Sequence, residues 1–148
     1  MKTIYPILVI LLGFFVMGCA SKGTTVDPMD KRIAKNWKVS VAREGSTIVF
    51  EVGGSNNTRP GYVNFTINLS GGGTVSFTDF DGTRFSGTWE LQGTSRLILK
   101  NLNPEPTGTN GTIEFTISDF TDTSMTLTRT TGSAKTGGTI NVYRLTTN

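Results

Sequence analysis

Apolar and polar residues alternate along most of this chain, and this alternation restricts the possible folds more than any other feature. Trp37, Val39 and Val41, for example, alternate with Lys38 and Ser40. Successive side chains of a β-strand point to opposite faces, so a period of two predicts strands with one apolar and one polar face. Similar segments recur to residue 145, which predicts eight or nine strands.

Glycine-containing turns such as Glu44-Gly45, Gly71-Gly72-Gly73 and Gly137-Gly138 separate most of the predicted strands. The turn sequences favour successive hairpins. The first strand is expected from Trp37, and the others at residues 47–52, 63–69, 75–80, 85–91, 97–102, 113–120, 125–130 and 140–145.

The turn at Asp81-Gly82 allows a prediction of register. A two-residue loop would place Phe77 and Phe85 on opposite faces of the sheet and divide its apolar face. A three-residue loop, with Gly82 in the left-handed region, pairs Phe77 with Phe85. We therefore predict the loop Phe80-Asp81-Gly82.

A short helix is expected before the first strand. Asp27-Pro28 is typical of a helix start, with Asp27 as the N-cap and Pro28 at the first helical position. The spacing of Met29, Ile33 and Trp37 then predicts a helix over residues 28–35 with one apolar side.

The predicted strands must cover one another, because the sequence contains no long helix to cover a sheet. An up-and-down antiparallel meander that closes into a barrel does this and removes exposed edges. We therefore expect an all-β barrel domain over residues 28–148 in preference to a sandwich. The Thr-rich faces are expected to be exposed to solvent, whereas a membrane barrel has an apolar outer face, so we do not expect a membrane barrel.

The N-terminal segment has the composition of a secretory signal. An apolar run from Ile4 to Met17 follows Lys2, and it is shorter than the roughly 20 residues of a membrane-spanning helix. The run ends in Val16-Met17-Gly18-Cys19, which resembles the lipobox of bacterial lipoproteins. A secreted protein with an incidental cysteine is the alternative interpretation.

The lipobox resemblance implies cleavage before Cys19 and acylation of its thiol and of the new amine. We accordingly expect residues 1–18 to be a lipoprotein signal peptide and residues 19–27 to be a flexible tether. Two or three acyl chains hold a protein firmly on a membrane. Ala20 after the cysteine resembles lipoproteins sorted to the outer membrane, so we expect its periplasmic side in a Gram-negative bacterium.

The composition excludes several kinds of chemistry within this chain. It has no histidine and a single cysteine among 148 residues, which excludes Ser-His-Asp and Cys-His catalysis and His- or Cys-ligated zinc. The net charge of +3 comes without basic runs interleaved with aromatic residues, so nucleic acid is not an expected partner. We expect no cofactor, no metal and no enzymatic activity.

Several segments, taken in order, resemble the lipocalin-like lipoproteins of the Bacteroidetes type. They are Lys35–Val39, Asn64–Thr66, Ser86–Leu91, Leu97–Leu99, Ser124–Thr128 and Asn141–Leu145. This resemblance implies a calyx that can hold a small apolar molecule.

The residues themselves permit two interiors. The large inward side chains either fill the barrel or line a ligand cavity, and the candidate lining residues are Phe65, Phe77, Phe85, Trp89 and Leu127.

Two arginines point to an anionic amphiphilic ligand. If Leu127 pairs with Val142 across the 131–139 loop, Arg129 and Arg144 share the apolar face. Cations buried there need a carboxylate, a wet rim or an anionic ligand. The alternative is that both reach water at the barrel ends through their long stems.

These observations predict a lipid-anchored, non-enzymatic envelope protein that binds a small ligand in its barrel. The alternative is a packed barrel that serves as a structural or partner-binding module of an envelope complex. In that case we expect contacts through loops such as residues 103–111, which contain Pro104 and Pro106.

Overall fold

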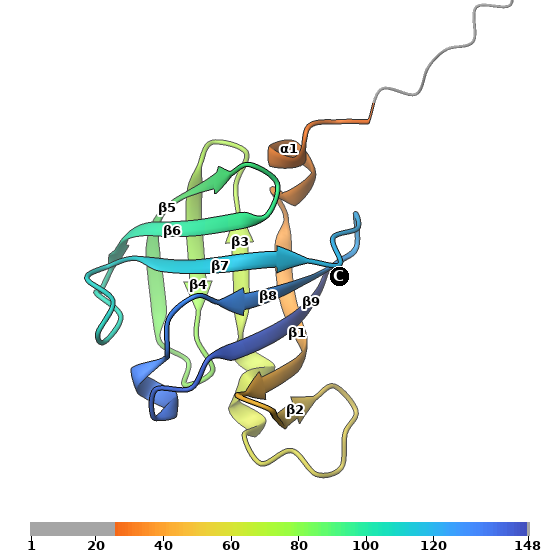
Figure 1. Ribbon diagram of the computed structural model, residues 1–148, viewed down its shortest axis with the longest axis vertical. Helices are drawn as coiled ribbons and strands as arrows, with labels where there is room; N and C mark the ends of the chain where they lie inside the picture. Colours follow the sequence, from red (N-terminus) through yellow and green to blue (C-terminus); the bar gives the residue numbers. More distant parts are fainter. Residues whose placement is uncertain (1–25, 148) are drawn as a thin grey trace, which may run out of the picture.

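The computed structural model describes residues 26–147, which form a small all-antiparallel β-barrel (Figure 1). Cys19, the expected signal peptide and residues 19–25 of the expected tether lie outside the described residues. The elements are α1 (Met29–Ile33), β1 (Asn36–Glu44), β2 (Thr47–Glu51), η1 (Pro60–Asn64), β3 (Thr66–Leu69), β4 (Thr74–Thr78), β5 (Arg84–Gln92), β6 (Arg96–Asn103), β7 (Ile113–Ser118), β8 (Ser124–Arg129), η2 (Ala134–Thr136) and β9 (Asn141–Thr147).

Eight strands form a closed ring, and most of them pair with the next strand in the chain. From β3 to β9 every strand pairs with the next, and β1 closes the ring by pairing with both β3 and β9. The extra strand β2 pairs with β1 beyond the point where β3 leaves it. The predicted meander of eight or nine strands is therefore confirmed, as eight barrel strands with one extra strand.

The two ends of the barrel are closed by different elements (Figure 1). At the upper end in this view, α1 lies next to the start of β1. At the lower end lie η1, η2 and the β4–β5 turn, and we call this the lower end throughout. Among the described residues, no helix is long and apolar enough to cross a membrane.

The inward faces of the strands form one hydrophobic core that is rich in aromatic rings. Trp37, Phe65 and Phe115 are almost completely buried there, together with Ile67 and Leu99. The predicted alternation thus places one side of nearly every strand in the core. The burial of these apolar side chains is the main stabilising contribution to a domain of this size.

The β4–β5 turn has the predicted three-residue loop. Phe77 pairs with Phe85 and Val75 with Gly87, and Gly82 has φ +83°. The Asp79 N–H donates to the Thr83 carbonyl at 2.9 Å, which closes the hairpin around residues 80–82. The two phenylalanine rings stack on the inner face with their centroids 5.3 Å apart.

The N-terminal helix is shorter than predicted. It covers Met29–Ile33, and Pro28 occupies the N-cap position without a side-chain hydrogen bond, so Asp27 is not the cap. Trp37 Nε1 donates to the Ile33 carbonyl at 2.8 Å, which satisfies an otherwise unpaired group where the helix ends. The predicted apolar side is present, because Ile33 and Trp37 are buried and Met29 packs on the core.

Two strand predictions are corrected by local irregularities. A bulge between Val39 and Val41 changes the register of β1 against β9, so Ala42 faces the core and Val41 lines the outer surface. The expected strand over residues 63–69 begins only at Thr66, because Pro60–Asn64 forms a 3₁₀ turn that buries Tyr62 and leaves Val63 exposed.

We predict that Gly87→Ala lowers the free energy of unfolding by about 1–3 kcal/mol, because the added Cβ would collide with the Lys100 carbonyl where β5 and β6 shift register. Gly72→Ala is the matched control, since its Cβ would lie 3.8 Å from the Ser70 hydroxyl. Urea unfolding curves measure both changes. Equal stability of the two variants would contradict the close approach at Gly87.

Candidate functional site

The predicted ligand-lining residues lie in the barrel interior, where they pack against one another. Phe65, Phe77, Phe85, Trp89 and Leu127 are between 0% and 9% exposed. Phe65 contacts Phe77 edge-on at 5.3 Å between centroids. These aromatic and aliphatic side chains form a packed core at the positions where the calyx interpretation places a ligand.

Tyr143 completes the aromatic packing, although it was not among the predicted lining residues. Its ring stacks on Phe65 at 4.4 Å between centroids and lies edge-on to Phe115 at 6.2 Å. Aromatic pairs of this kind contribute about 0.5–1.5 kcal/mol beyond the area that they bury. Rings from β7, β9 and the residue just before β3 therefore contact one another in the interior.

The predicted register of the last hairpin is wrong. Leu127 pairs with Tyr143 and Thr126 with Arg144, so Tyr143 points inward and Arg144 is exposed on the outer face. The connecting loop contains η2 and two left-handed glycines, Gly137 and Gly138, and it closes with a different number of residues than the prediction assumed.

Arg129 lies on the inner face, as predicted, and is only 8% exposed. Its Nε donates to the Thr131 carbonyl at 3.2 Å, and within residues 26–147 it forms no ion pair. Arg129 and Arg144 therefore do not form a shared anion site.

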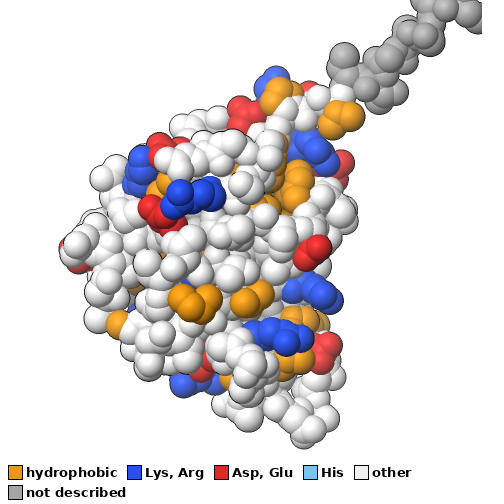
Figure 2. All heavy atoms as spheres, viewed as in Figure 1, with side chains coloured by type: hydrophobic (Ala, Val, Ile, Leu, Met, Phe, Trp, Pro, Cys, Tyr) orange, Lys and Arg blue, Asp and Glu red, His pale blue; other side chains and the backbone are white. Residues whose placement is uncertain are grey.

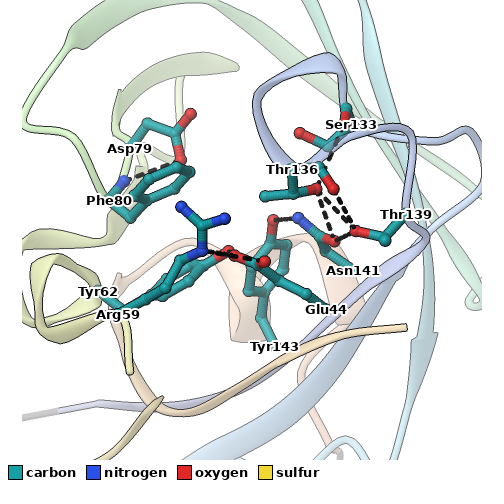
Figure 3. A network of polar contacts seen from close by, with 10 residues as sticks. All are labelled: Glu44, Arg59, Tyr62, Asp79, Phe80, Ser133, Thr136, Thr139, Asn141 and Tyr143. Carbon is teal, nitrogen blue, oxygen red and sulfur yellow. Dashed lines mark hydrogen bonds and ion pairs between the residues drawn. The ribbon is translucent and has the colours of Figure 1, made fainter. Parts of the chain in front are cut away.

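The lower end of the barrel is closed by polar groups around Tyr62 (Figure 3). The Tyr62 hydroxyl donates to Glu44 at 3.1 Å, and Arg59 Nε lies 2.8 Å from the same carboxylate. The rings of Tyr62 and Phe80 lie 4.8 Å apart, with the Arg59 guanidinium 5.6 Å from the Phe80 centroid. Side chains from β1, η1 and the β4–β5 turn thus cover this end together.

A second chain of hydrogen bonds continues from Tyr143 into the η2 loop (Figure 3). Asn141 Nδ2 donates to the Tyr143 hydroxyl at 3.1 Å, and Asn141 Oδ1 accepts bonds from Thr136 at 3.1 Å and Thr139 at 2.7 Å. Asn141 is completely buried. No buried side-chain nitrogen or oxygen in the described residues lacks a partner, as expected for a stable polar network.

Both tyrosines keep their protons at neutral pH. Burial raises the pKa of Tyr62, and the nearby Tyr143 and Glu44 raise it further. Burial also raises the pKa of Tyr143, to about 12. As neutral hydroxyl groups they connect the loops to the barrel wall, while Glu44 is held by Arg59 and Tyr62.

Lys135 links the η2 loop to the β4–β5 turn. Its ammonium lies 3.1 Å from Asp79 and 2.7 Å from Asp81, and 5.3 Å above the centre of the Phe85 ring. Burial favours the neutral form of Lys135, but the two carboxylates outweigh this effect and raise its pKa. Desolvation would raise the pKa of Asp81, yet the hydrogen bonds from Lys135 and from the Thr83 N–H lower it to about 2.

A hollow of about 400 Å³ lies on the outside of the barrel over β1, β2, β8 and β9, and we call it the outer hollow. It was not predicted. Its lining residues are Val41, Arg43, Ile48, Glu51, Asp119, Thr126, Val142 and Arg144. In residues 26–147, no group of three or more His, Cys, Asp and Glu side chains is arranged to hold a metal ion.

We predict that the Lys135 contact makes stability fall between about pH 4 and pH 2. The pKa of Asp81 is lowered in the folded protein, so its contribution is present above the unfolded pKa of about 3.9 and lost as the pH falls through about 2. Asp81→Asn should lower the melting temperature at pH 6 and flatten its decline below pH 4.

Asp30→Asn is the control for this measurement, since Asp30 is exposed and forms no ion pair in the described part of the chain. Thermal unfolding followed by circular dichroism at pH 6, 4, 3 and 2 gives the comparison. Parallel curves for Asp81→Asn and the wild type would show that Lys135 does not act through Asp81.

Comparison with known proteins gives no match for this chain: no protein-family model matches it, and no curated protein or solved structure is significantly similar to it.

Proposed function

We propose that this protein is a lipid-anchored lipoprotein on the periplasmic side of the outer membrane of a Gram-negative bacterium. In this proposal its barrel acts without catalysis, as a module that binds a partner through its outer surface. A ligand carried inside the barrel is the competing function.

The observation that carries the proposal is the contrast between the interior and the outer face. The inward side chains at the predicted ligand positions pack ring against ring, and those rings are at most 9% exposed. Arg144, which was expected inside, lies instead beside the outer hollow. Groups available for binding are therefore found outside the barrel.

The end at which the chain enters the domain shows which part of the barrel the proposed anchor would hold. Residue 26 leads into α1 at the upper end in Figure 1. Thr147 near the end of β9 pairs with Trp37 near the start of β1, so the strand finishes close to the point where the chain enters the barrel. A lipid on Cys19 would tether this upper end and leave the barrel wall and the lower end accessible to other proteins.

We predict that Cys19→Ser abolishes acylation and cleavage of the N-terminal segment, because the lipobox interpretation requires the thiol. The wild type and the control Ser21→Ala should incorporate labelled palmitate and fractionate with membranes. Mass spectrometry of the N-terminal peptide provides an independent measurement. A free Cys19 thiol in the wild-type protein would refute the lipid anchor.

We predict that the purified wild-type protein shows no saturable 1:1 binding of a fluorescent fatty acid, because rings occupy the interior. Phe65→Ala should lower the free energy of unfolding by about 3–5 kcal/mol, since it removes a buried ring from this packing. Fluorescence titration measures the first effect and urea unfolding the second. Saturable binding that Phe65→Ala weakens would instead favour the ligand carrier.

A further inference from the structure

A second hollow, of about 580 Å³, lies on the outside of the barrel over β3, β4, β5 and β6, and we call it the neutral hollow. Its ten lining residues are all uncharged, and eight of them are Ser, Thr or Asn. The lining therefore offers hydrogen-bonding groups but no charge to an occupant.

Charged side chains are common elsewhere on the outer surface. Figure 2 shows basic, acidic and hydrophobic side chains spread over the face of the barrel that is turned to the viewer. The outer hollow is lined by two arginines and two carboxylates. At the margin of the neutral hollow, Lys100 lies opposite Thr88, but its ammonium pairs with Glu90. Arg84, two residues before Ser86 on β5, is not among the lining residues.

Four of the lining residues form a row across the sheet. Asn68 of β3 lies opposite Ser76 of β4. Ser86 of β5 lies between Ser76 on one side and Asn103 of β6 on the other. All four residues are exposed on the outer face. Because neighbouring strands lie about 4.8 Å apart, the row extends over roughly 14 Å.

The side chains of this row have free hydrogen-bonding groups. None of the four forms a hydrogen bond within residues 26–147, whereas the neighbouring Ser70 and Thr74 hydroxyls bond each other at 2.7 Å and Asn101 donates to Thr88 at 3.3 Å. An amide supplies two donor hydrogens and an acceptor, and a hydroxyl supplies both functions. The row can therefore bind a ligand that is itself rich in donors and acceptors.

A bulge adds a third amide to the neutral hollow. The register of β6 against β5 shifts between Ser86 and Thr88. Within this shift Asn101 has φ +52°, a left-handed conformation that few residues other than glycine adopt. Asn101 and Asn103 are both exposed and both line the hollow. Bulges of this kind often redirect a side chain beside a binding site.

These properties disfavour three kinds of occupant. A charged partner would lose hydration without finding an opposite charge in the lining. An apolar partner would find little apolar surface, because Val75 is only 4% exposed. A peptide cannot add to the sheet here as a strand, because β3, β4, β5 and β6 are each paired on both sides. The remaining class is an uncharged ligand rich in hydroxyl and amide groups.

The shape of the neutral hollow favours an extended ligand over a small one. One sheet face supplies the lining, so the hollow covers an occupant on one side only, whereas small ligands usually bury most of their surface. A chain that repeats its polar groups gains further contacts along the row instead. A glycan chain has this repetition.

We propose that the neutral hollow binds an uncharged glycan chain of the cell wall, built from N-acetylhexosamine units. Sugar hydroxyl groups would bond Ser76 and Ser86. Acetamido groups, each with one N–H donor and one carbonyl acceptor, would bond the amides of Asn68 and Asn103. This inference rests on the proposed function, in which the protein faces the wall from the periplasmic side of the outer membrane, and it names the chemistry of the partner.

The interaction of a single domain with a short oligomer should be weak. Hydrogen bonds between neutral groups contribute modestly in water, and the lining contains no aromatic ring on which a sugar could stack. We expect a Kd of about 0.1–1 mM. Several anchored copies on one glycan strand would bind it more firmly than one copy does.

The test is a titration of the purified full-length protein, in a detergent without a sugar head group, with a hexamer of N-acetylglucosamine. Nuclear magnetic resonance of the ¹⁵N-labelled protein should show saturable shifts of the side-chain amide signals of Asn68 and Asn103. The amide signal of Asn56, which is exposed in the loop after β2, should not move. A hexamer of galacturonic acid is the charged control and should not bind.

Two substitutions at Ser76 test the role of the row. Ser76→Val and Ser76→Thr place side chains of the same shape at its centre, both suited to a strand, and only threonine keeps the hydroxyl. Ser76→Val and Asn68→Ala should each weaken binding about threefold to tenfold, whereas Ser76→Thr should retain it. Asn56→Ala is the matched control for Asn68→Ala. Circular dichroism checks that each variant folds, and the shifts of the wild-type protein test the proposal without any variant.

The absence of saturable shifts at Asn68 and Asn103 would overturn the proposal, as would equal affinity for the galacturonic acid hexamer. Binding that Ser76→Val and Asn68→Ala leave unchanged would also overturn it. Membrane fractionation of cells that express the protein separates this inference from the proposed function. Normal anchoring without glycan binding refutes the glycan site alone, whereas protein that is not membrane-bound refutes the proposed anchor.

Discussion

The pairing of β1 with β9 is the interaction on which the rest of the structure depends. It joins the start of the domain to its end and closes the hydrogen-bonded ring from Trp37 opposite Thr147 to Glu44 opposite Asn141. An open sheet with the same strands would expose its aromatic face and two edges. Closure turns that face into a core, and the bulge at Val39 and Val41 lets β1 continue past β3 to support β2.

Much of the fold could be predicted because the alternation is strong and the turns are short. Phe77 and Phe85 must share a face, so the apolar pattern alone determined the loop at residues 80–82. The last hairpin differs, because Val142 and Tyr143 are both suitable core residues and its long loop leaves the register open. The observed register buries the Tyr143 ring and leaves Arg144 in water, so it avoids the cost of a second buried cation. The alternation of apolar and polar residues alone does not reveal this difference in free energy between the two registers.

The same limit explains which parts of the candidate site were missed. Phe65, Phe77, Phe85, Trp89, Leu127 and Arg129 were correctly expected to face inward, whereas Arg144 was not. The outer hollow depends on the bulge that turns Val41 outward. A single bulge is hard to recognise from the amino-acid pattern of a short strand. Tyr62 lay one residue before the strand expected at 63–69, although Pro60-Gly61 before it is a signal for a turn.

The hydrogen bonds of Asn57 and Arg59 along β2 have a consequence for the lipid anchoring proposed above. Anchored molecules diffuse in two dimensions, so copies meet one another far more often than they would at the same abundance in solution. If the extra strand β2 had an unpaired edge, it could pair with β2 of a neighbouring copy and begin a row of paired copies. Asn57 and Arg59 bond the edge at Glu51 and Val49 from within the same molecule, which would favour individual copies over a polymer on the proposed membrane.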